Sequence, residues 1–453
     1  MGARTLTLLA VGVVAGCGGN STGTHTGLGE AYDDPQVRAS LRALSPDTLP
    51  PPPPDISNRF ADNPQAALLG QKLFFDRGFS GPLLDSDNDG TTGTLGRRGE
   101  VGKVACADCH NPTAGFSDRR TLRGQISLGA GWGARRARSL LDVGQAKLLM
   151  WDGRRDALYN QPFTPVETAV ELNSSRLFVA EQIFARYRAE YEALFGPMPP
   201  LGDASRFPPL SPAHAGCEGL QVGAVCHGVP GDRAEFDSMS AADQEAVTRV
   251  AVNFGKALGA YERRLSCGGG RFDQWIHGDE AALSVQEKRG AALFVGARAG
   301  CSACHSGPFL SDQTFHNMGL EPTSVALFFT DRDDRGAAAG LASMLADRLN
   351  VKGPFSDGDD GRIPARVLST DEGAFRTPSL RCVSGRPSFM HTGQIRTLDD
   401  TVSFFNRGGD TSGFLGTSEN TPRSLSADEE GQLVAFLKTL DGPGPAASLL
   451  RAP

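Results

Sequence analysis

Apolar residues recur at helical spacing over a long stretch in the middle of the chain. The stretch is bounded by a helix start signal at Ser240 and Asp243 and by a break at Cys267 and the three glycines that follow it. The apolar positions are Val247, Val250, Ala251, Phe254, Leu258, Tyr261 and Leu265. Steps of three and four place all of them on one stripe of a helix. The spacing therefore predicts a long amphipathic helix.

A second helical pattern lies near the C-terminal end. Ser426 and Glu429 form a capping-box pattern, in which the two side chains satisfy N–H groups at the start of a helix. The apolar positions that follow are Leu433, Val434, Phe436, Leu437 and Leu440. No convincing run of alternating apolar and polar residues predicts strands. We therefore expect a mostly α fold with long loops.

Two segments of the chain repeat. Residues 69–74 and residues 289–294 each form a helix-like segment that ends in Leu-Phe. Each leads into a CxxCH motif, at residues 106–110 and 301–305, and then into a turn that reads FSD or FLSD. Two such modules predict two domains of one kind.

The N-terminal residues carry an export signal. Arg4 precedes an apolar run over residues 6–15, which is too short to span a bilayer but has the size of a signal-peptide core. The run ends at Val-Ala-Gly-Cys17, which resembles a bacterial lipobox. An ordinary signal peptide with a coincidental Cys is the alternative. We predict that residues 1–17 are a lipoprotein signal peptide and that Cys17 anchors the protein at the periplasmic face.

Composition narrows the classes of protein. The chain has 453 residues, 39% hydrophobic and 21% charged, which suits a soluble globular protein and excludes collagen-like, disordered and polytopic membrane proteins. The 45 basic and 52 acidic side chains leave a net charge of −7, which disfavours nucleic acid as a partner. Residues 18–57 are rich in Gly, Ser, Thr and Pro and are expected to form a tether, so that the lipid anchor is the only membrane contact.

The CxxCH motif has a chemical rationale. Two thiols two residues apart can each form a thioether with a haem vinyl group, and the adjacent His then ligates the iron. The candidate residues are Cys106, Cys109 and His110 in the first motif and Cys301, Cys304 and His305 in the second. About 0.003 copies are expected by chance from the composition. A zinc site built on the first motif is the alternative, and export and duplication both favour haem.

Together with these motifs, five further blocks carry a family resemblance. They are LFFD at 73–76, WDGR at 151–154, FHNMGL at 315–320, FRTPSLR at 375–381 and FMHTG at 389–393. From about residue 64 to residue 440 the chain resembles the bacterial di-haem cytochrome c peroxidases and their MauG-type relatives. The resemblance implies two cytochrome c-like domains with one covalent c-type haem each. These are a peroxidatic domain over residues 58–265 and an electron-transfer domain over residues 266–445.

The resemblance also assigns site residues. In that family a Trp lies between the haems, and a Gln ten residues later and a Glu twenty residues later line the distal pocket of the first haem. Trp151, Gln161 and Glu171 keep this spacing. Trp151 is thus expected to relay electrons. Cleavage of a peroxide needs an open iron site and a group that moves a proton between two oxygens, and a sheltered carboxyl such as Glu171 can do this.

The chain departs from the family pattern at both haems. Ala130 replaces the His of a Gly-His-Gly-Trp segment that blocks the first haem in many peroxidases, so that haem is expected to be five-coordinate and open. The sixth ligand of the second haem is expected fourteen residues after His391, where Phe405 offers no donor atom. Met318, Met390 and His391 are residual candidates, but each is expected rather to pack near the haem. The iron at His305 is therefore expected to have no sixth protein ligand, or to have water in that position.

The family's calcium and the remaining cysteines complete the picture. Calcium between the haems is a further candidate cofactor, but its Asn ligand would fall in residues 135–139, which contain no Asn. A guanidinium there could replace the charge of the cation.

Cys217 and Cys226 flank a short Gly-rich loop and are expected to form a local disulfide. Cys267 would then pair with Cys382 by elimination.

These features support one leading function and leave alternatives open. The leading interpretation is an exported di-haem oxidoreductase that reduces hydrogen peroxide with electrons from a small redox protein, such as a cytochrome c or a cupredoxin. MauG-type oxidation of a partner protein's residues through a high-valent di-haem state is the first alternative. The open first haem favours it, and the absence of any Tyr after residue 261, where that family places a ligand, counts against it. A non-enzymatic electron-transfer cytochrome and oxygenase chemistry on a hydrophobic substrate are the others.

Overall fold

The computed structural model describes residues 30–120, 126–216, 234–324, 326 and 333–453. The described chain is mostly helical, which confirms the predicted class. The α-helices are α1 (Pro35–Leu44), α2 (Pro64–Phe75), α3 (Cys106–Cys109), α4 (Phe163–Glu167), α5 (Arg176–Arg186), α6 (Arg188–Phe195), α7 (Ala234–Asp237), α8 (Ala241–Glu262), α9 (Arg271–Ile276), α10 (Val285–Val295), α11 (Ala337–Ala346), α12 (Leu398–Arg407) and α13 (Ala427–Lys438). The short 3-10 helices are η1 (Ala31–Asp33), η2 (Arg77–Phe79), η3 (Pro112–Ala114), η4 (Val143–Gln145), η5 (Pro212–His214), η6 (Cys301–Ala303), η8 (Ser369–Asp371) and η9 (Ala447–Leu449). Strands β1 (Phe315–His316) and β2 (Phe375–Arg376) form one short antiparallel pair.

The two predicted long helices are both present. In α8 the Ser240 hydroxyl accepts a hydrogen bond from the Asp243 N–H at 3.2 Å, as its start signal predicts. The last apolar residue of that pattern, Leu265, lies beyond the end of the helix. In α13 the side chains of Ser426 and Glu429 form the predicted capping box. Each helix begins where its cap lies, because the capping side chains satisfy N–H groups that have no partner inside the helix.

The two repeated segments have equivalent places in the fold. The first lies in α2, which packs on α8, and the second lies in α10, which packs on α13. Each crossing is held at a glycine. A Cβ atom at Gly70 would lie 1.9 Å from the Ala257 carbonyl oxygen, and one at Gly290 would lie 1.9 Å from the Gln432 carbonyl oxygen. Only glycine allows backbones to approach this closely, so both helix pairs use the same crossing.

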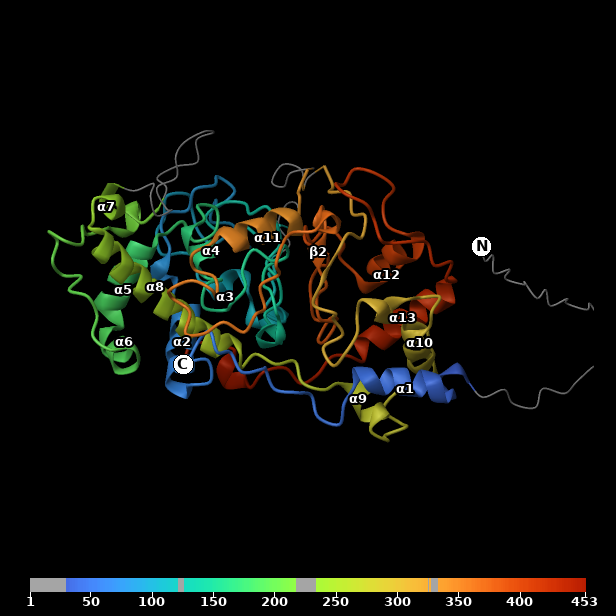
Figure 1. Cartoon of the computed structure of the whole chain (residues 1–453). Helices are drawn as coiled ribbons and strands as arrows, with labels where there is room; N and C mark the ends of the chain where they lie inside the picture. Colours follow the sequence, from blue (N-terminus) through green and yellow to red (C-terminus); the bar gives the residue numbers. More distant parts are fainter. Residues whose placement is uncertain (1–29, 121–125, 217–233, 325, 327–332) are drawn as a thin grey trace, which may run out of the picture.

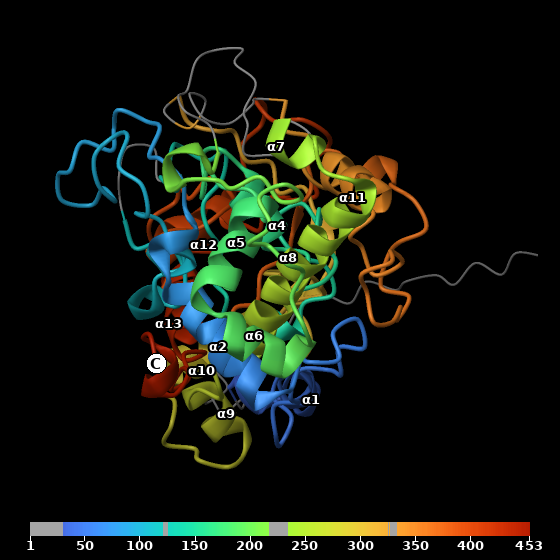
Figure 2. The same cartoon turned by 90° about the vertical axis from the view of Figure 1, so that its left-hand side faces the viewer.

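The molecule has two halves with separate cores and a third core between them. The half with α2, α5 and α8 lies on the left of Figure 1, and the half with α9, α10, α12 and α13 lies on the right. In Figure 2 the left-hand half faces the viewer, and the other half lies behind it. The third cluster joins Tyr159 and Phe163 of the first half to Leu341, Met344 and Phe355, which come later in the chain. Through this cluster α11 packs against the first half.

The prediction that residues 18–57 form a tether is wrong for the part of this stretch that the structure describes. Residues 35–44 form α1, which begins at Asp34, whose carboxylate accepts hydrogen bonds from the Gln36 and Val37 N–H groups. Leu41 and Leu44 are buried in the core of the second half. The composition of the whole stretch hid a short apolar stripe at positions 37, 41 and 44. Figure 1 shows α1 beneath α10 and α13.

The C-terminal tail, which follows the predicted domain end at residue 445, packs on the first half, whereas α1 packs on the second. Leu449 is buried in the core of the first half. Its carbonyl oxygen accepts a hydrogen bond from the Tyr261 hydroxyl at 2.6 Å, and the Gln71 amide donates to the carbonyls of Ser448 and Arg451. The C-terminus therefore lies beside α2 in Figure 1. Each end of the described chain is thus packed on the half to which it is not connected.

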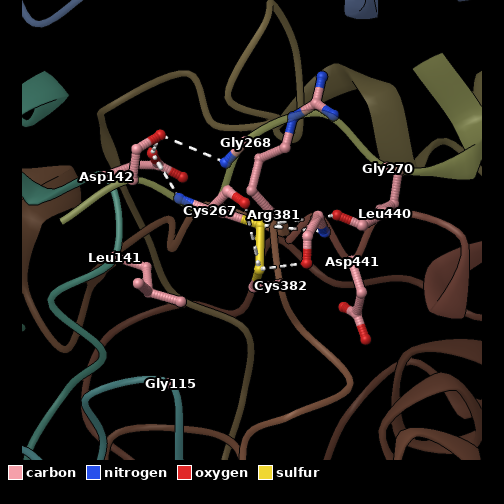
Figure 3. The surroundings of a disulfide bond; sticks show 12 residues. Gly115, Leu141, Asp142, Cys267, Gly268, Gly270, Arg381, Cys382, Leu440 and Asp441 are labelled. Atoms are coloured by element: carbon pink, nitrogen blue, oxygen red, sulfur yellow. Dashed lines mark hydrogen bonds between the residues drawn. A yellow bond between two sulfur atoms is a disulfide. The ribbon is translucent and has the colours of Figure 1, made fainter. Parts of the chain in front are cut away.

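A disulfide joins Cys267 and Cys382 and confirms the pairing expected by elimination. Figure 3 shows that it connects the segment after α8 to a loop of the second half. The Asp142 carboxylate, from the first half, accepts hydrogen bonds from the Cys267 N–H at 3.2 Å and from the Ser266 hydroxyl at 3.0 Å. The disulfide therefore fixes the junction between the two halves. The other expected pair, Cys217 with Cys226, lies outside the described residues.

The predicted signal peptide and its lipobox Cys17 also lie outside the described residues. Among the helices that the structure describes, none is both long enough and apolar enough to cross a membrane.

Candidate functional site

The first CxxCH motif opens onto a cavity of about 690 Å³ in the first half. Cys106 and Cys109 begin and end α3, and His110 follows directly, so all three line this cavity. The His110 Nδ1 atom lies 2.8 Å from the Arg138 carbonyl oxygen and 3.1 Å from that of Phe116. A carbonyl only accepts, so Nδ1 carries the hydrogen and Nε2 keeps a free lone pair. This is the arrangement of a histidine that ligates a metal through Nε2.

The second motif repeats this arrangement in the other half. Cys301, Cys304 and His305 line a cavity of about 270 Å³. The His305 Nδ1 atom donates to the Leu310 carbonyl oxygen at 2.9 Å. Burial lowers the pKa of His305, as it does that of His110, which keeps both rings neutral. Both motifs thus present one imidazole nitrogen to a cavity.

The four motif thiols are free and face the same cavities. Burial raises the pKa of Cys109 to about 12 and that of Cys301 to about 11, so these two thiols are neutral rather than thiolate. Zinc binds thiolate. In the part of the chain that the structure describes, the ligand atoms of Cys106, Cys109 and His110 do not gather into one metal site. At the first motif, the paired thiols at the cavity wall therefore fit a haem better than a zinc ion.

Glu171 and Gln161 both line the first cavity, as the sequence predicts. Burial raises the pKa of Glu171, and the positive charge of Arg154, which lines the same cavity, partly opposes this shift. The Gln161 amide nitrogen donates to the sulfur of Met150 at 3.4 Å. The structure therefore brings together a carboxyl with raised proton affinity and an amide.

The loop that contains Ala130 supports the Glu171 backbone. The Ala130 N–H donates to the Glu171 carbonyl oxygen at 2.8 Å, and the Gly131 N–H donates to that of Val170 at 2.9 Å. A Cβ atom at Gly129 would lie 2.7 Å from the Glu171 carbonyl oxygen, so only glycine fits there. The Ala130 side chain is buried in the core of the first half and does not line the cavity. At this position nothing protrudes into the cavity.

Trp151 lines both cavities and lies in the wall between them. Its indole N–H donates to the Arg136 carbonyl oxygen at 2.8 Å, and the Arg138 guanidinium lies 4.6 Å from the ring centre. Its own carbonyl accepts a hydrogen bond from the Arg376 N–H of β2 at 2.8 Å. Both halves therefore hold the Trp151 segment in place.

Phe405, at the expected ligand position, lines the second cavity from α12. Met318, Met390 and His391 line the same cavity. The His391 ring stacks on Phe375 with its centre at 3.7 Å, and burial lowers its pKa to about 3. The structure thus places all the candidate ligands at the second cavity, and Phe405 offers it only carbon atoms.

A guanidinium lies within the stretch where the family places a calcium ligand. Arg135 pairs with Asp152 at 2.6 Å and with Asp334 at 2.6 Å, and its own side chain is 14% exposed. Asp334 lines both cavities. Arg154 also pairs with Asp152, at 2.9 Å, so two guanidinium groups balance the two carboxylates. The carboxylates of Asp152 and Asp334 were not found from the sequence, since single Asp residues carry no spacing signal.

Three further arginines at the cavities were also missed. Arg138 and Arg376 line both cavities, and Arg386 lines the second. In the described residues none of them forms an ion pair, and the Nε atoms of Arg376 and Arg386 are buried without an acceptor. Buried guanidinium groups without acids fit a bound group that carries carboxylates, as haem does. The donor set and the wall charges therefore both fit haem.

The chain is similar to known di-haem cytochrome c peroxidases and MauG proteins. The family model described as di-haem cytochrome c peroxidase matches residues 64–281. The methylamine utilization protein MauG of Methylorubrum extorquens is 27% identical over 96% of this chain and 95% of its own. The cytochrome-c peroxidase IdrP1 of Denitromonas iodatirespirans is 29% identical over 85% of this chain and 84% of its own.

Two solved structures share the fold. The diheme peroxidase BthA from Burkholderia thailandensis superposes with a TM-score of 0.58 at 21% identity, over 85% of this chain and 87% of its own. A MauG-like protein associated with microbial copper homeostasis superposes with a TM-score of 0.56 at 22% identity, over 90% of this chain and 96% of its own. At this identity the likeness concerns the fold alone.

Proposed function

Because the chain belongs to the family of di-haem cytochrome c peroxidases and MauG proteins, we propose that it reduces hydrogen peroxide at its first cavity. The electrons come from a small redox protein, such as a cytochrome c or a cupredoxin, and enter at the second cavity. The family implies two c-type haems. In our proposal the two CxxCH motifs bind them through thioether bonds, with His110 and His305 as proximal ligands.

The observation that carries this proposal is the content of the first cavity. A carboxyl with raised proton affinity, Glu171, and the amide of Gln161 share it with His110. Ala130 leaves the cavity clear. A small ligand therefore has room beside a carboxyl that can exchange protons and an amide that can donate a hydrogen bond.

The reduction of one peroxide molecule consumes two electrons and two protons and yields two molecules of water. A haem held by His110 would supply the iron at which the O–O bond is cleaved. Glu171 takes the proton from one peroxide oxygen and returns it to the departing oxygen, which leaves as water. The Gln161 amide orients the peroxide by a hydrogen bond. Trp151 carries electrons from the second cavity to the first, because its ring reaches both.

A second candidate function is MauG-type oxidation of a partner protein's residues. Two observations favour it. Ala130 leaves the first cavity open, and the MauG of Methylorubrum extorquens matches 96% of this chain. Phe405 counts against it, because the family's MauG-type members carry a Tyr at that position.

Turnover separates the two candidates. We expect the haem-loaded protein to oxidise two molecules of a reduced small cytochrome c for each peroxide consumed, continuously and under steady-state conditions. Reduced cytochrome and reduced cupredoxin should both be assayed as donors. If neither donor is oxidised although peroxide reacts with the protein, the peroxidase proposal is wrong and the partner-oxidation candidate replaces it.

We also propose that the protein is exported and lipid-anchored at Cys17, on the pattern of residues 1–17. Full-length protein should partition with membranes, and Cys17→Ser should lose the lipid mass and leave that fraction. Mass spectrometry of the N-terminal peptide measures this. An unlipidated Cys17 in the mature protein would contradict the anchor.

A further inference from the structure

Three arginines in and beside the wall between the cavities form no ion pair with any acidic residue that the structure describes. Arg138 and Arg376 line both cavities, whereas Arg386 lines the second only. In the ranges that the structure describes, their guanidinium groups bond only to neutral acceptors. These are the Met150 carbonyl for Arg138 at 2.7 Å, the Gln313 side-chain oxygen for Arg376 at 2.9 Å, and the Ser379 and Arg381 carbonyls for Arg386 at 2.8 and 2.9 Å. We call Arg138, Arg376 and Arg386 the arginine wall.

Arg135 lies at the same junction and has the opposite pattern. It is held by both Asp152 and Asp334, at 2.6 Å each. The fold can therefore place carboxylates beside a guanidinium at this junction, and it does so for Arg135 alone among these four arginines. The missing partners of the arginine wall are a specific feature rather than a general shortage of acids.

Isolated buried cations are costly. The Nε atoms of Arg376 and Arg386 are buried without an acceptor, which costs free energy that a bound acceptor would restore. Burial lowers the pKa of both side chains to about 10. The positive charges of Arg376 and Arg386 also act on Arg138, and Asp152 opposes them only from beyond ion-pair distance. Asp142 and Asp441 likewise act on Arg386 only from beyond ion-pair distance. Among the described residues, the wall therefore has no carboxylate close enough for an ion pair.

The chemistry of the guanidinium group indicates what supplies that charge. Its planar fork matches a carboxylate or phosphate and binds either with two hydrogen bonds. Each haem carries two carboxylate groups at one edge of its ring, and the CxxCH motifs place a haem in each of the two cavities that the wall separates. We propose that the arginine wall binds carboxylates of both haems, with Arg138 and Arg376 shared between them and Arg386 serving the second haem.

This inference rests on the proposed binding of two haems but not on the substrate. It has a structural consequence, because both haems would turn their carboxylate edges toward Trp151, whose ring lies 4.6 Å from the Arg138 guanidinium. The inference also has an electrostatic consequence. A positive charge near a haem favours the reduced state, so a shared arginine raises the midpoint potential of both haems at once.

The test is a spectroelectrochemical titration of the purified haem-loaded protein, with the two haems resolved by EPR. Arg376→Gln keeps the backbone bond from residue 376 to Trp151, so only the charge and the fork are lost. We expect it to lower the midpoint potentials of both haems, and Arg376→Lys to retain most of the charge effect. Arg386→Gln should lower the potential of the His305 haem alone. Arg407→Gln is the matched control, since Arg407 is 54% exposed and pairs with Asp410 at the surface.

The outcomes are distinct. The proposal is overturned if Arg376→Gln shifts neither potential by more than Arg407→Gln does, or if Arg386→Gln shifts both haems equally. Neither result depends on peroxide turnover, so the proposed function can fail while this inference stands, and the reverse also holds.

A second measurement needs no variant. Haem labelled with ¹³C at its carboxylates should show redox-induced infrared difference bands at the positions of arginine-bound carboxylates rather than of hydrated ones. Bands at the hydrated positions would contradict the proposal even if a wall variant fails to fold.

Discussion

The cavity around His110 and the cavity around His305 begin alike and then diverge. In both, a CxxCH motif lines the wall and the His Nδ1 atom donates to a backbone carbonyl. The first cavity then contains the carboxyl of Glu171 and the amide of Gln161. The second contains the thioethers of two methionines and the ring of Phe405.

This difference shows which parts of a duplicated module determine chemistry. The helix pairs and the motif are common to both halves, so they account for attachment and for the proximal ligand. The groups that face these ligands come from long loops and from α12, which have no counterpart in the repeat. In our proposal the duplication supplies two haem-binding sites, and the loops make one of them suitable for peroxide and the other for electron entry.

The largest effect is expected from a substitution that removes the proton-transferring group from the first cavity. Glu171→Gln should lower the rate of peroxide reduction by about 10²–10⁴, because general acid–base catalysis contributes roughly that factor. Stopped-flow measurement of peroxide consumption gives the rate. Glu245→Gln, at an exposed pair on α8, is the control and should change little. A Glu171→Gln enzyme with wild-type turnover would remove the asymmetry on which the comparison depends.

The disulfide provides the next test of the difference between the halves. Replacing both Cys267 and Cys382 by Ser should cost about 2–5 kcal/mol of unfolding free energy, since the bond closes a long loop. The loop after Cys382 supplies Val383, Arg386 and Met390 to the second cavity. We expect the second haem spectrum to be lost at a lower temperature than in the wild type, ahead of the first. Simultaneous loss of both haems would show that the bond does not act locally.

The pH dependence of the peroxide reaction is a third test. Burial raises the pKa of Glu171, so its protonated form, which cannot accept a proton, persists to higher pH than that of a free Glu. Below this raised pKa the rate should fall about tenfold per pH unit, and above it the rate should level off. A pH–rate profile from stopped flow measures this. This change of rate with pH should vanish in Glu171→Gln. An identical pH–rate profile in that variant would assign the change to another group.

The smallest expected effect concerns the second cavity. Phe405→Met would add a thioether donor on α12, and the second haem should shift toward a six-coordinate low-spin state with a higher potential. Phe405→Leu is the control without a donor atom. Absorption and EPR spectra report the change, and the peroxide rate should alter only a fewfold. A spectrum equal to that of Phe405→Leu would show that Phe405 does not lie opposite His305.

The two long helices could be predicted from the sequence, and the CxxCH motifs could be recognised in it, because each rests on a local rule. A fixed spacing brings Cys106, Cys109 and His110 together, and a cap with helical periodicity determines where α8 begins. Helix α1 was missed, because Gly and Pro around it lowered the apolar content of the whole stretch. Its burial depends on a partner surface more than two hundred residues away.

The arginine wall could not be predicted for a related reason. A single Arg in a sequence is by default a solvated side chain. Only the packing of loops from both halves shows that Arg138, Arg376 and Arg386 are buried near one another and form no ion pair with the described acidic residues. Trp151 was assigned through a family resemblance, and the structure places it at both cavities.

The central claim is that the first cavity holds an open iron site and that peroxide reacts there. EPR spectra of the fully oxidised, haem-loaded protein before and after one equivalent of peroxide test it most directly. We predict a high-spin signal from the His110 haem that disappears when peroxide is added. Two low-spin six-coordinate haems whose spectra do not change with peroxide would contradict the account.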